Sequence, residues 1–166
     1  MKKIITFLAV VGMFSIQSCT VSDNTPIVDN DTISEVFEVT TSFNSTNNYT
    51  STVSLFPAIY SSDVVLVYHL YGVVNGEDVW RLMPQTYYMS DGGALDYNFD
   101  FTVNRVKIFL GADFNLNTLS STWTQNQTFR IVIVPAGFSA SINKNSYPAV
   151  TAALNINESQ IQKINF

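Results

Sequence analysis

The chain is poor in the side chains that covalent and metal chemistry require. Its 166 residues include one cysteine, Cys19, and one histidine, His69. A disulfide framework needs an even number of cysteines, so Cys19 is expected to serve another purpose. A nucleophilic triad or a zinc site combines histidine or cysteine with further partners, and the chain has no such spacing. We therefore expect no catalytic residue and no metal site, with His69 a structural residue of a strand.

Glycine-rich loops and basic clusters are also missing. The seven glycines form neither Gly-x-Gly-x-x-Gly nor a phosphate-binding loop with lysine, so we expect no cofactor. Eight Lys and Arg stand against thirteen Asp and Glu, which gives a net charge of -5. Beyond residue 18 the cations are few and scattered, whereas nucleic-acid binding normally requires a basic patch. The sequence thus excludes nucleic acid as an expected partner.

The N-terminus has the layout of a signal peptide. Lys2 and Lys3 precede an apolar run from 4 to 16, and small or polar residues follow it. A membrane-spanning helix needs roughly 20 consecutive apolar residues, and this run is shorter. We predict that residues 1–18 are removed.

The cleavage region Ile16-Gln17-Ser18-Cys19 resembles the lipobox of bacterial lipoproteins, in which the enzyme cuts before an acylated cysteine. Gln17 departs from the small residue that is usual there, although signals of the Bacteroidota tolerate it. The resemblance implies lipidation at Cys19 and membrane attachment through the N-terminal lipid. More than one acyl chain gives stable anchoring, so the folded domain itself need not bind the membrane.

Residues 19–34 are predicted to form a flexible acidic tether, since they contain Asp, Asn and Pro but few large apolar residues. Acids near the lipidated cysteine resemble the signal for display on the outer face of the outer membrane in the Bacteroidota. We expect a surface-exposed outer-membrane lipoprotein, with a periplasm-facing one as the alternative. Asp31-Thr32-Ile33 resembles the O-glycosylation acceptor of that group, which makes Thr32 a candidate site.

Residues 35–166 are predicted to form a single, mainly β domain, an antiparallel β-sandwich that is immunoglobulin-like or similar. The clearest strand runs from Leu95 to Val103, where apolar and polar residues alternate. The run from Phe129 to Val134 is apolar on both sides apart from Arg130, as expected for a central strand. Val106, Ile108 and Leu110 indicate a further strand. Pro148 begins a short C-terminal helix, Asn157 and Gln160 fit a second helix start, and residues 161–166 are expected to dock on the sandwich.

Asn75-Gly76 predicts a β-hairpin between the strands 64–74 and 77–83. A two-residue loop pairs Val74 with Glu77, Tyr71 with Trp80 and His69 with Leu82. One face then carries Val67, His69, Tyr71, Asp78, Trp80 and Leu82, and the other carries Val64, Leu66, Tyr68, Leu70, Val79, Arg81 and Met83. The second face is more continuously apolar, so we expect it to face the core.

Carboxylates were considered as catalytic pairs and as calcium ligands. Glu77, Asp78, Asp91, Asp96 and Asp100 are the candidates for a glycosidase, but turns and the wet face of a strand explain them. Asp96 to Asp100 also match the start of a calcium loop. The match ends at Phe101, where glycine is required, and at Lys107, where glutamate is required.

Aromatic residues offer the remaining route to recognition. Tyr71 and Trp80, with Tyr87 and Tyr88 on the following strand, would form a flat platform for sugar rings if their face were exposed. The alternative is that they pack into the core or under a loop. Trp123, in a polar loop, is a second candidate for ligand binding.

Segments between Trp80 and Phe138, including Pro84-Gln85-Thr86-Tyr87-Tyr88 and the run from Thr124 to Val134, resemble a family of small uncharacterised lipoproteins from flavobacteria. Automated labels in that family include dihydrolipoamide dehydrogenase and collagen-like protein. The chain lacks the dinucleotide motif and redox cysteine pair of the first and the glycine repeat of the second. Two functions stay open, namely a non-catalytic scaffold or protein-interaction domain of the cell envelope and a glycan-binding module.

Overall fold

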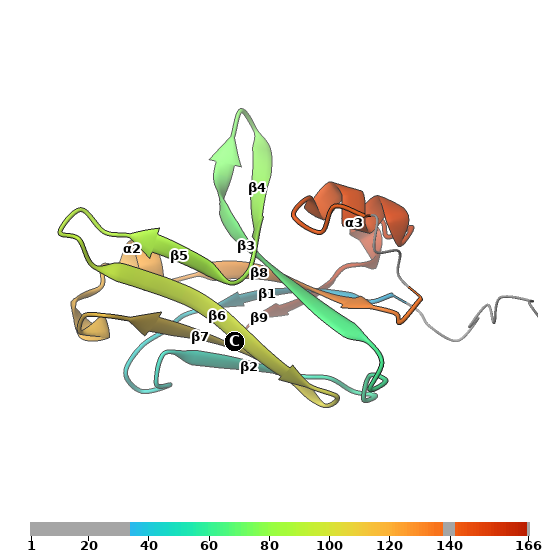
Figure 1. Cartoon of the computed structure of the whole chain (residues 1–166), viewed down its shortest axis with the longest axis horizontal. Helices are drawn as coiled ribbons and strands as arrows, with labels where there is room; N and C mark the ends of the chain where they lie inside the picture. The colour runs from blue at the N-terminus through green and yellow to red at the C-terminus, as the bar shows by residue number, and fades with distance from the viewer. Residues whose placement is uncertain (1–33, 138–141, 166) are drawn as a thin grey trace, which may run out of the picture.

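Two β-sheets packed face to face form the body of the molecule (Figure 1). A computed structural model of the chain describes residues 34–137 and 142–165. The predicted signal peptide, Cys19 and Thr32 lie outside these residues. The prediction of a mainly β sandwich with one short C-terminal helix is confirmed.

The larger sheet has the strand order β4-β3-β8-β1-β9, and the smaller has β2-β7-β6-β5. The strands are β1 (Val36–Thr41), β2 (Thr50–Ser54), β3 (Val64–Val74), β4 (Glu77–Leu82), β5 (Gln85–Tyr88), β6 (Ala94–Thr102), β7 (Arg105–Ala112), β8 (Gln127–Val134) and β9 (Gln162–Asn165). The short helices are η2 (Leu116–Thr118), α2 (Ser121–Thr124), α3 (Tyr147–Ala153) and η3 (Glu158–Gln160).

Strand β8 occupies the centre of the larger sheet, as its apolar run predicts. It pairs with β1 on one side and with β3 on the other. Ile131 and Ile133 face the core between the two sheets, whereas Val132 and Val134 belong to a second cluster beneath α3. A strand covered on both faces tolerates few polar residues, so Arg130 requires partners of its own.

Strand β6 has the predicted alternation of apolar and polar residues, but only some of its apolar side chains are buried as predicted. Leu95 and Tyr97 are fully buried and Phe99 packs partly against the core. Phe101 and Val103 were expected on the buried face and are exposed. Both residues lie beyond the part of β6 that pairs with β5, and Val103 is already in the turn to β7.

The β3–β4 hairpin forms with the predicted turn, but its register differs beyond the first three pairs. Asn75 and Gly76 have φ angles of 53° and 86°, and Val74 pairs with Glu77 as predicted. The register shifts between Leu70 and Gly72, because Tyr71 is an extra residue in a β-bulge. Trp80 therefore pairs with Leu70 rather than with Tyr71, and Leu82 pairs with Tyr68 rather than with His69.

The face of β3 that lies between the two sheets is the opposite of the one predicted. Val65 and Val67 lie in the core between the sheets, with His69 buried beside them. Leu66 and Tyr68, on the face expected to be that core, lie instead beneath α3. Both faces of β3 are buried in its first half, so comparing their apolar content could not identify the inner one.

The C-terminal segment covers the outer face of the larger sheet. Ser146 caps α3 by accepting a hydrogen bond from the Ala149 amide at 3.3 Å, and Pro148 lies in the first turn. Asn157 begins η3, where the side chain of Gln160 accepts the Asn157 amide at 2.7 Å. Strand β9 then pairs with β1 in parallel, the exception to antiparallel pairing among the described strands.

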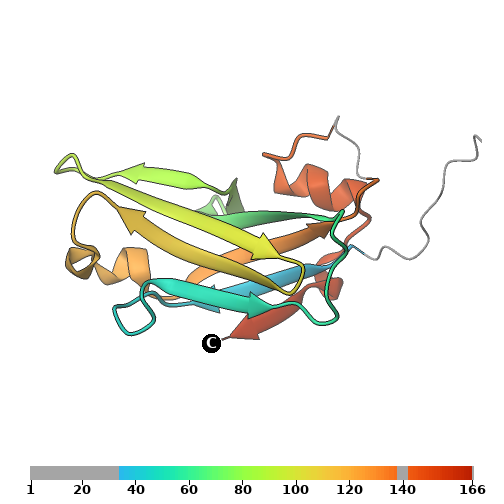
Figure 2. The ribbon, with the colours of Figure 1, turned by 60° about the horizontal axis from the view of Figure 1, so that its bottom comes forward.

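The sandwich has two distinct ends (Figure 2). We call proximal the end where β1 and β3 begin and β8 finishes, because the chain enters the described domain there. The opposite, distal end carries α2 and the β5–β6 turn (Figure 1). The β3–β4 hairpin projects sideways from the body, beyond both sheets (Figure 1).

Candidate functional site

The predicted flat platform of four aromatic residues is not assembled. Tyr71 stacks on Tyr87 with the two ring centroids 6.1 Å apart and the planes within 3° of parallel. Trp80 instead lies on the α3 side, 5.5 Å from the ring of Tyr147. Tyr87 is buried, and Tyr88 points outward with 82% of its surface exposed. Tyr71 and Trp80 thus occupy opposite faces of the hairpin, so the predicted pairing of these two residues is wrong. Trp80 and Tyr87 pack against the two hydrophobic clusters, which is the alternative to an exposed platform.

Both aromatic residues instead hold the base of the hairpin. On the inner face the Arg81 guanidinium carbon lies 3.3 Å from the centroid of the Tyr71 ring. On the outer face the Arg130 guanidinium carbon lies 4.4 Å from the centroid of the Trp80 ring. Stacking of an arginine on an aromatic ring stabilises by about 0.5–2 kcal/mol, depending on how far the pair is desolvated. The hairpin is therefore clamped on two sides where it leaves the sheets.

Arg130 is the centre of an ionic cluster near this base. Its Nη1 and Nη2 atoms each donate to a carboxylate oxygen of Glu158 at 2.8 Å, and Nε donates to Glu38 at 3.0 Å. Lys163 Nζ also lies 3.2 Å from Glu38. Burial alone would raise the pKa of Glu38, but the hydrogen bonds from Arg130 and Lys163 outweigh it and the pKa is lowered. This cluster joins β8, β1, β9 and η3.

We call residues 71–79 the arm. Tyr71, Val73 and Val74 are 50%, 62% and 55% exposed, an unusual density of apolar surface on one short hairpin. Glu77 and Asp78 are exposed beside the valines and pair with Val74 and Val73. The arm therefore exposes apolar side chains bordered by two acidic ones. Its base is held by the Tyr71–Arg81 and Trp80–Arg130 contacts.

His69 lies at the centre of a buried polar network. Gln127 Nε2 donates to the carbonyl oxygens of Thr122 at 3.0 Å and Gln125 at 2.7 Å, so its Oε1 is the acceptor that faces His69 Nε2 at 3.1 Å. His69 Nδ1 is 3.2 Å from the Tyr87 hydroxyl. The ring also stacks between Tyr97 and Phe129, with centroid distances of 4.5 and 4.9 Å. Burial lowers the pKa of His69 to about 4.

This network positions Trp123 at the distal end. The hydroxyl of Tyr97 donates to the carbonyl oxygen of Trp123, and Gln127 holds the carbonyls on either side of it. The Trp123 ring packs on Tyr87, with 5.1 Å between their centroids. The indole is therefore fixed by neighbours that are themselves buried.

Trp123 lines a cavity of about 240 Å³ between α2, η2 and the β5–β6 turn. Met89, Phe114, Leu119 and Trp123 provide its apolar walls. Ser90, Asp91, Thr118 and Ser120 provide its polar groups. A Cβ atom on Gly93 would lie 2.7 Å from the ring of Phe114, so a glycine at this position lets Phe114 close one wall. Trp123 was the only one of these residues that the sequence marked as a binding candidate.

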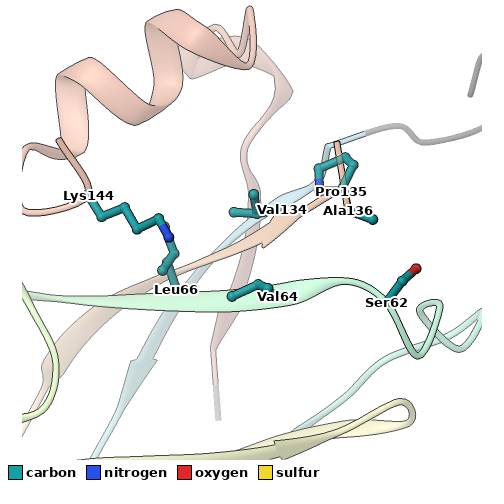
Figure 3. Close-up of a pocket in the computed structure, with 7 residues that line it drawn as sticks. All are labelled: Ser62, Val64, Leu66, Val134, Pro135, Ala136 and Lys144. Carbon is teal, nitrogen blue, oxygen red and sulfur yellow. The ribbon is translucent and has the colours of Figure 1, made fainter. Parts of the chain in front are cut away.

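A second, smaller cleft opens at the proximal end (Figure 3). Its volume is about 80 Å³, far below the 300–1,000 Å³ typical of ligand pockets. Apolar side chains from the start of β3 and the end of β8 form most of it, and Lys144 reaches along one side (Figure 3). The Tyr68 hydroxyl donates to the Lys144 carbonyl at 2.6 Å, which fixes this loop over the sheet.

The carboxylates considered for catalysis are dispersed. Glu77 and Asp78 lie on the arm, Asp91 at the distal cavity, and Asp96 accepts the Thr86 hydroxyl at 2.5 Å. Asp100 contacts Arg105 at 2.7 Å, and this hydrogen bond lowers its pKa. Within residues 34–137 and 142–165, no group of three or more acidic, His or Cys side chains is placed to hold a metal ion. In the same residues, no helix is long and apolar enough to cross a membrane.

Comparisons with protein-family models, with curated proteins and with solved structures found no match for this chain.

Proposed function

We propose that this protein is a lipid-anchored component of the cell envelope whose β-domain is a non-catalytic protein-interaction module. The arm is the contact element. The observation that carries the proposal is its three exposed apolar side chains, Tyr71, Val73 and Val74, on a hairpin that projects beyond both sheets.

The energetics of the arm support a role in binding. A two-stranded hairpin that packs on nothing is marginally stable in water, so a projecting hairpin needs contacts at its base. Here the Tyr71–Arg81 and Trp80–Arg130 contacts hold it on both faces. Apolar area removed from water contributes about 25 cal/mol per Å², and a preordered arm loses little entropy on binding.

The charges on the arm indicate the chemistry of its partner. Glu77 and Asp78 border the exposed valines. We infer a partner protein with an apolar groove bordered by Lys or Arg side chains. A second copy of this chain fits less well, because it would bring two acidic arm tips together and the chain already carries a net charge of -5.

The surroundings of His69 favour binding over catalysis. Its two ring nitrogens face Tyr87 and Gln127 inside the core, and only 4% of the residue is exposed. A general acid or base must reach the proton that it transfers, and a ring enclosed in this way does not reach a substrate.

Attachment to the membrane is proposed from the N-terminal sequence. The motif Ile16-Gln17-Ser18-Cys19 supports acylation of Cys19, and the acidic residues after it support display on the outer membrane surface, with a periplasm-facing orientation as the alternative. The resemblance to small flavobacterial lipoproteins supports the same location. Two or more acyl chains would hold the domain at the membrane without help from its own surface.

Anchoring is tested by expressing the full chain and its Cys19→Ala variant in the producing cells. We expect the native protein in the membrane fraction, with an acylated Cys19 at its N-terminus by mass spectrometry, and the variant outside that fraction. Protease treatment of intact cells then separates surface display from a periplasm-facing location. An unmodified Cys19 in a protein that fractionates with the soluble material would overturn the anchoring.

The arm is tested by purifying the full chain from detergent-solubilised cells as wild type, as the double variant Val73→Asp/Val74→Asp, and as the matched control Val103→Asp. Val103 is exposed in the β6–β7 turn, away from the arm. We expect a co-purifying partner that, once purified, binds the double variant at least tenfold more weakly than the wild type or the control. Equal affinity for all three, or self-association in place of a partner, contradicts the proposal.

A further inference from the structure

The distal cavity combines an aromatic wall with a polar rim, and neither the arm nor the anchor requires it. Trp123, Phe114, Met89 and Leu119 line one part, and hydroxyl or carboxylate groups line the rest. We propose that this cavity binds one neutral sugar ring, as the terminal or single exposed residue of a glycan. The inference stands independently of the proposed partner of the arm.

The size of the cavity limits the ligand. Its volume of about 240 Å³ lies just below the 300–1,000 Å³ range of pockets that enclose drug-sized molecules. One pyranose ring matches such a space, whereas an extended oligosaccharide requires a groove. The ligand therefore enters end-on, with the remainder of a glycan outside the cavity.

The lining matches the amphipathic surface of a sugar. A pyranose has a face of C–H groups, which stacks on aromatic rings, and an edge of hydroxyl groups, which need polar partners. Trp123 and Phe114 supply the aromatic rings for the C–H face. Ser120 lines the cavity and its side chain does not cap α2, so we assign its hydroxyl to the ligand.

Asp91 determines the charge of the ligand. Its Oδ1 accepts the Gly93 amide at 3.2 Å, which orients the carboxylate at the turn, and we assign Oδ2 to a ligand hydroxyl. A hydrogen bond to an ionised acceptor is stronger than one to a neutral acceptor. The same negative charge repels uronic and sialic acids, so the neutral hexoses and their N-acetyl derivatives are the class that fits.

The position and rigidity of the site agree with this role. Tyr97 and Gln127 fix the backbone around Trp123, so the aromatic wall is preordered. The cavity is lined by residues of η2, α2 and the β5–β6 turn. Helix α2 and this turn lie at the distal end, whereas β1 begins at the proximal end (Figure 1). The cavity and the start of the described domain therefore lie at opposite ends of the sandwich.

The test is a nuclear magnetic resonance titration of the ¹⁵N-labelled full chain in detergent with the methyl glycosides of glucose, galactose, mannose and N-acetylglucosamine. The two indole N–H signals, from Trp80 and Trp123, report on the two faces separately. We expect saturable shifts of the Trp123 indole and of the amides of Ser90, Asp91 and Ser120 with at least one glycoside, and none at Trp80.

Three variants make the outcome decisive. Asp91→Ala should weaken binding at least fivefold and Trp123→Phe at least threefold, whereas Trp80→Phe should leave it unchanged. The proposal is overturned if none of the four glycosides gives saturable shifts at Trp123, if glycerol shifts the same signals equally, or if Asp91→Ala binds as tightly as the wild type. The arm variant Val73→Asp/Val74→Asp should bind sugar normally, which keeps this result separate from the test of the partner.

Discussion

The Nδ1 atom of His69 lies 3.2 Å from the hydroxyl oxygen of Tyr87, inside the core between the two sheets. Because Gln127 presents its carbonyl oxygen to Nε2, the proton of the neutral imidazole resides on Nε2 and Nδ1 accepts the Tyr87 hydroxyl. Both ring nitrogens are thus satisfied without a charge. A buried polar network of this kind stabilises the fold only while every member keeps its partner.

We predict that His69 titrates far below the ordinary range of histidine. Burial lowers its pKa to about 4, since the charged imidazolium would lose its hydration. His69 is the only histidine in the chain, so its imidazole C–H resonances can be assigned without ambiguity. A pH titration by nuclear magnetic resonance should show no shift of these signals between pH 8 and 5.5. A midpoint near 6.5 would contradict the buried, neutral assignment.

The same shift makes folding stability depend on pH. The folded pKa is below the unfolded value of about 6.5, so the contribution of His69 is complete above pH 6.5 and is lost as the pH falls towards 4. The free energy of unfolding should decrease by up to about 1.4 kcal/mol per pH unit in this window. Urea unfolding of the wild type and of His69→Gln at several pH values measures the difference. If the free energy of unfolding changed with pH in the same way for both proteins between pH 6.5 and 4.5, the predicted contribution of His69 would be refuted.

Arg130 should be far more important for stability than the exposed arginine of β7. Arg130→Met removes a buried guanidinium and leaves the mostly buried Glu38 with only the exposed Lys163 as a cationic partner, so we expect a loss of about 3–5 kcal/mol in the free energy of unfolding. Arg105→Met is the matched control, because its ion pair with Asp100 is solvent-exposed. Chemical denaturation compares the two variants. Equal, small effects would mean that the Arg130 cluster contributes little to stability.

Gly93 should be required for the shape of the distal cavity. Gly93→Ala places a methyl group 2.7 Å from Phe114, so the ring must shift, at a cost of about 1–3 kcal/mol. Gly72→Ala is the control, since its Cβ would meet nothing within 4 Å. Thermal unfolding and the Trp123 indole signal should change in the first variant only. An unchanged indole signal in Gly93→Ala would show that Phe114 does not shape the cavity.

Arg81 should control local motion of the arm rather than global stability. Arg81→Ala removes the guanidinium that stacks on Tyr71, so the arm should open more often. Hydrogen exchange of the amides of residues 72–79 should accelerate severalfold, with little change in β8. Lys107→Ala, which removes an exposed cation beside Phe109, is the control and should leave arm exchange unaltered. Equal exchange in the two variants would contradict a clamped base.

The strands that the sequence predicted well have strong local signals. The apolar run of β8, the alternation in β6 and the Asn75-Gly76 turn each depend on residues close together in the chain. The C-terminal helix with Pro148 in its first turn is a signal of the same kind. Such features need no knowledge of what packs above them.

The features that sequence reasoning missed depend on contacts between distant residues. The bulge at Tyr71 shifted the hairpin register by one, which moved Trp80 from the predicted platform to the side of Tyr147. No local pattern marks Phe114 as a wall of the cavity that Trp123 lines, because its ring lies there only where Gly93, distant in sequence, leaves room for it. The partners of Arg130, Glu38 and Glu158, lie 92 and 28 residues away in sequence.

The most direct test of the interaction role is site-specific photo-crosslinking in living cells that produce the protein. A photoreactive amino acid replaces Val74 in the full chain, and Val103 in the matched control. We predict one dominant adduct from position 74 alone, joined to a different protein at a peptide that lies in an apolar groove bordered by Lys or Arg. No adduct specific to position 74, or an adduct of two copies of this chain, would contradict it.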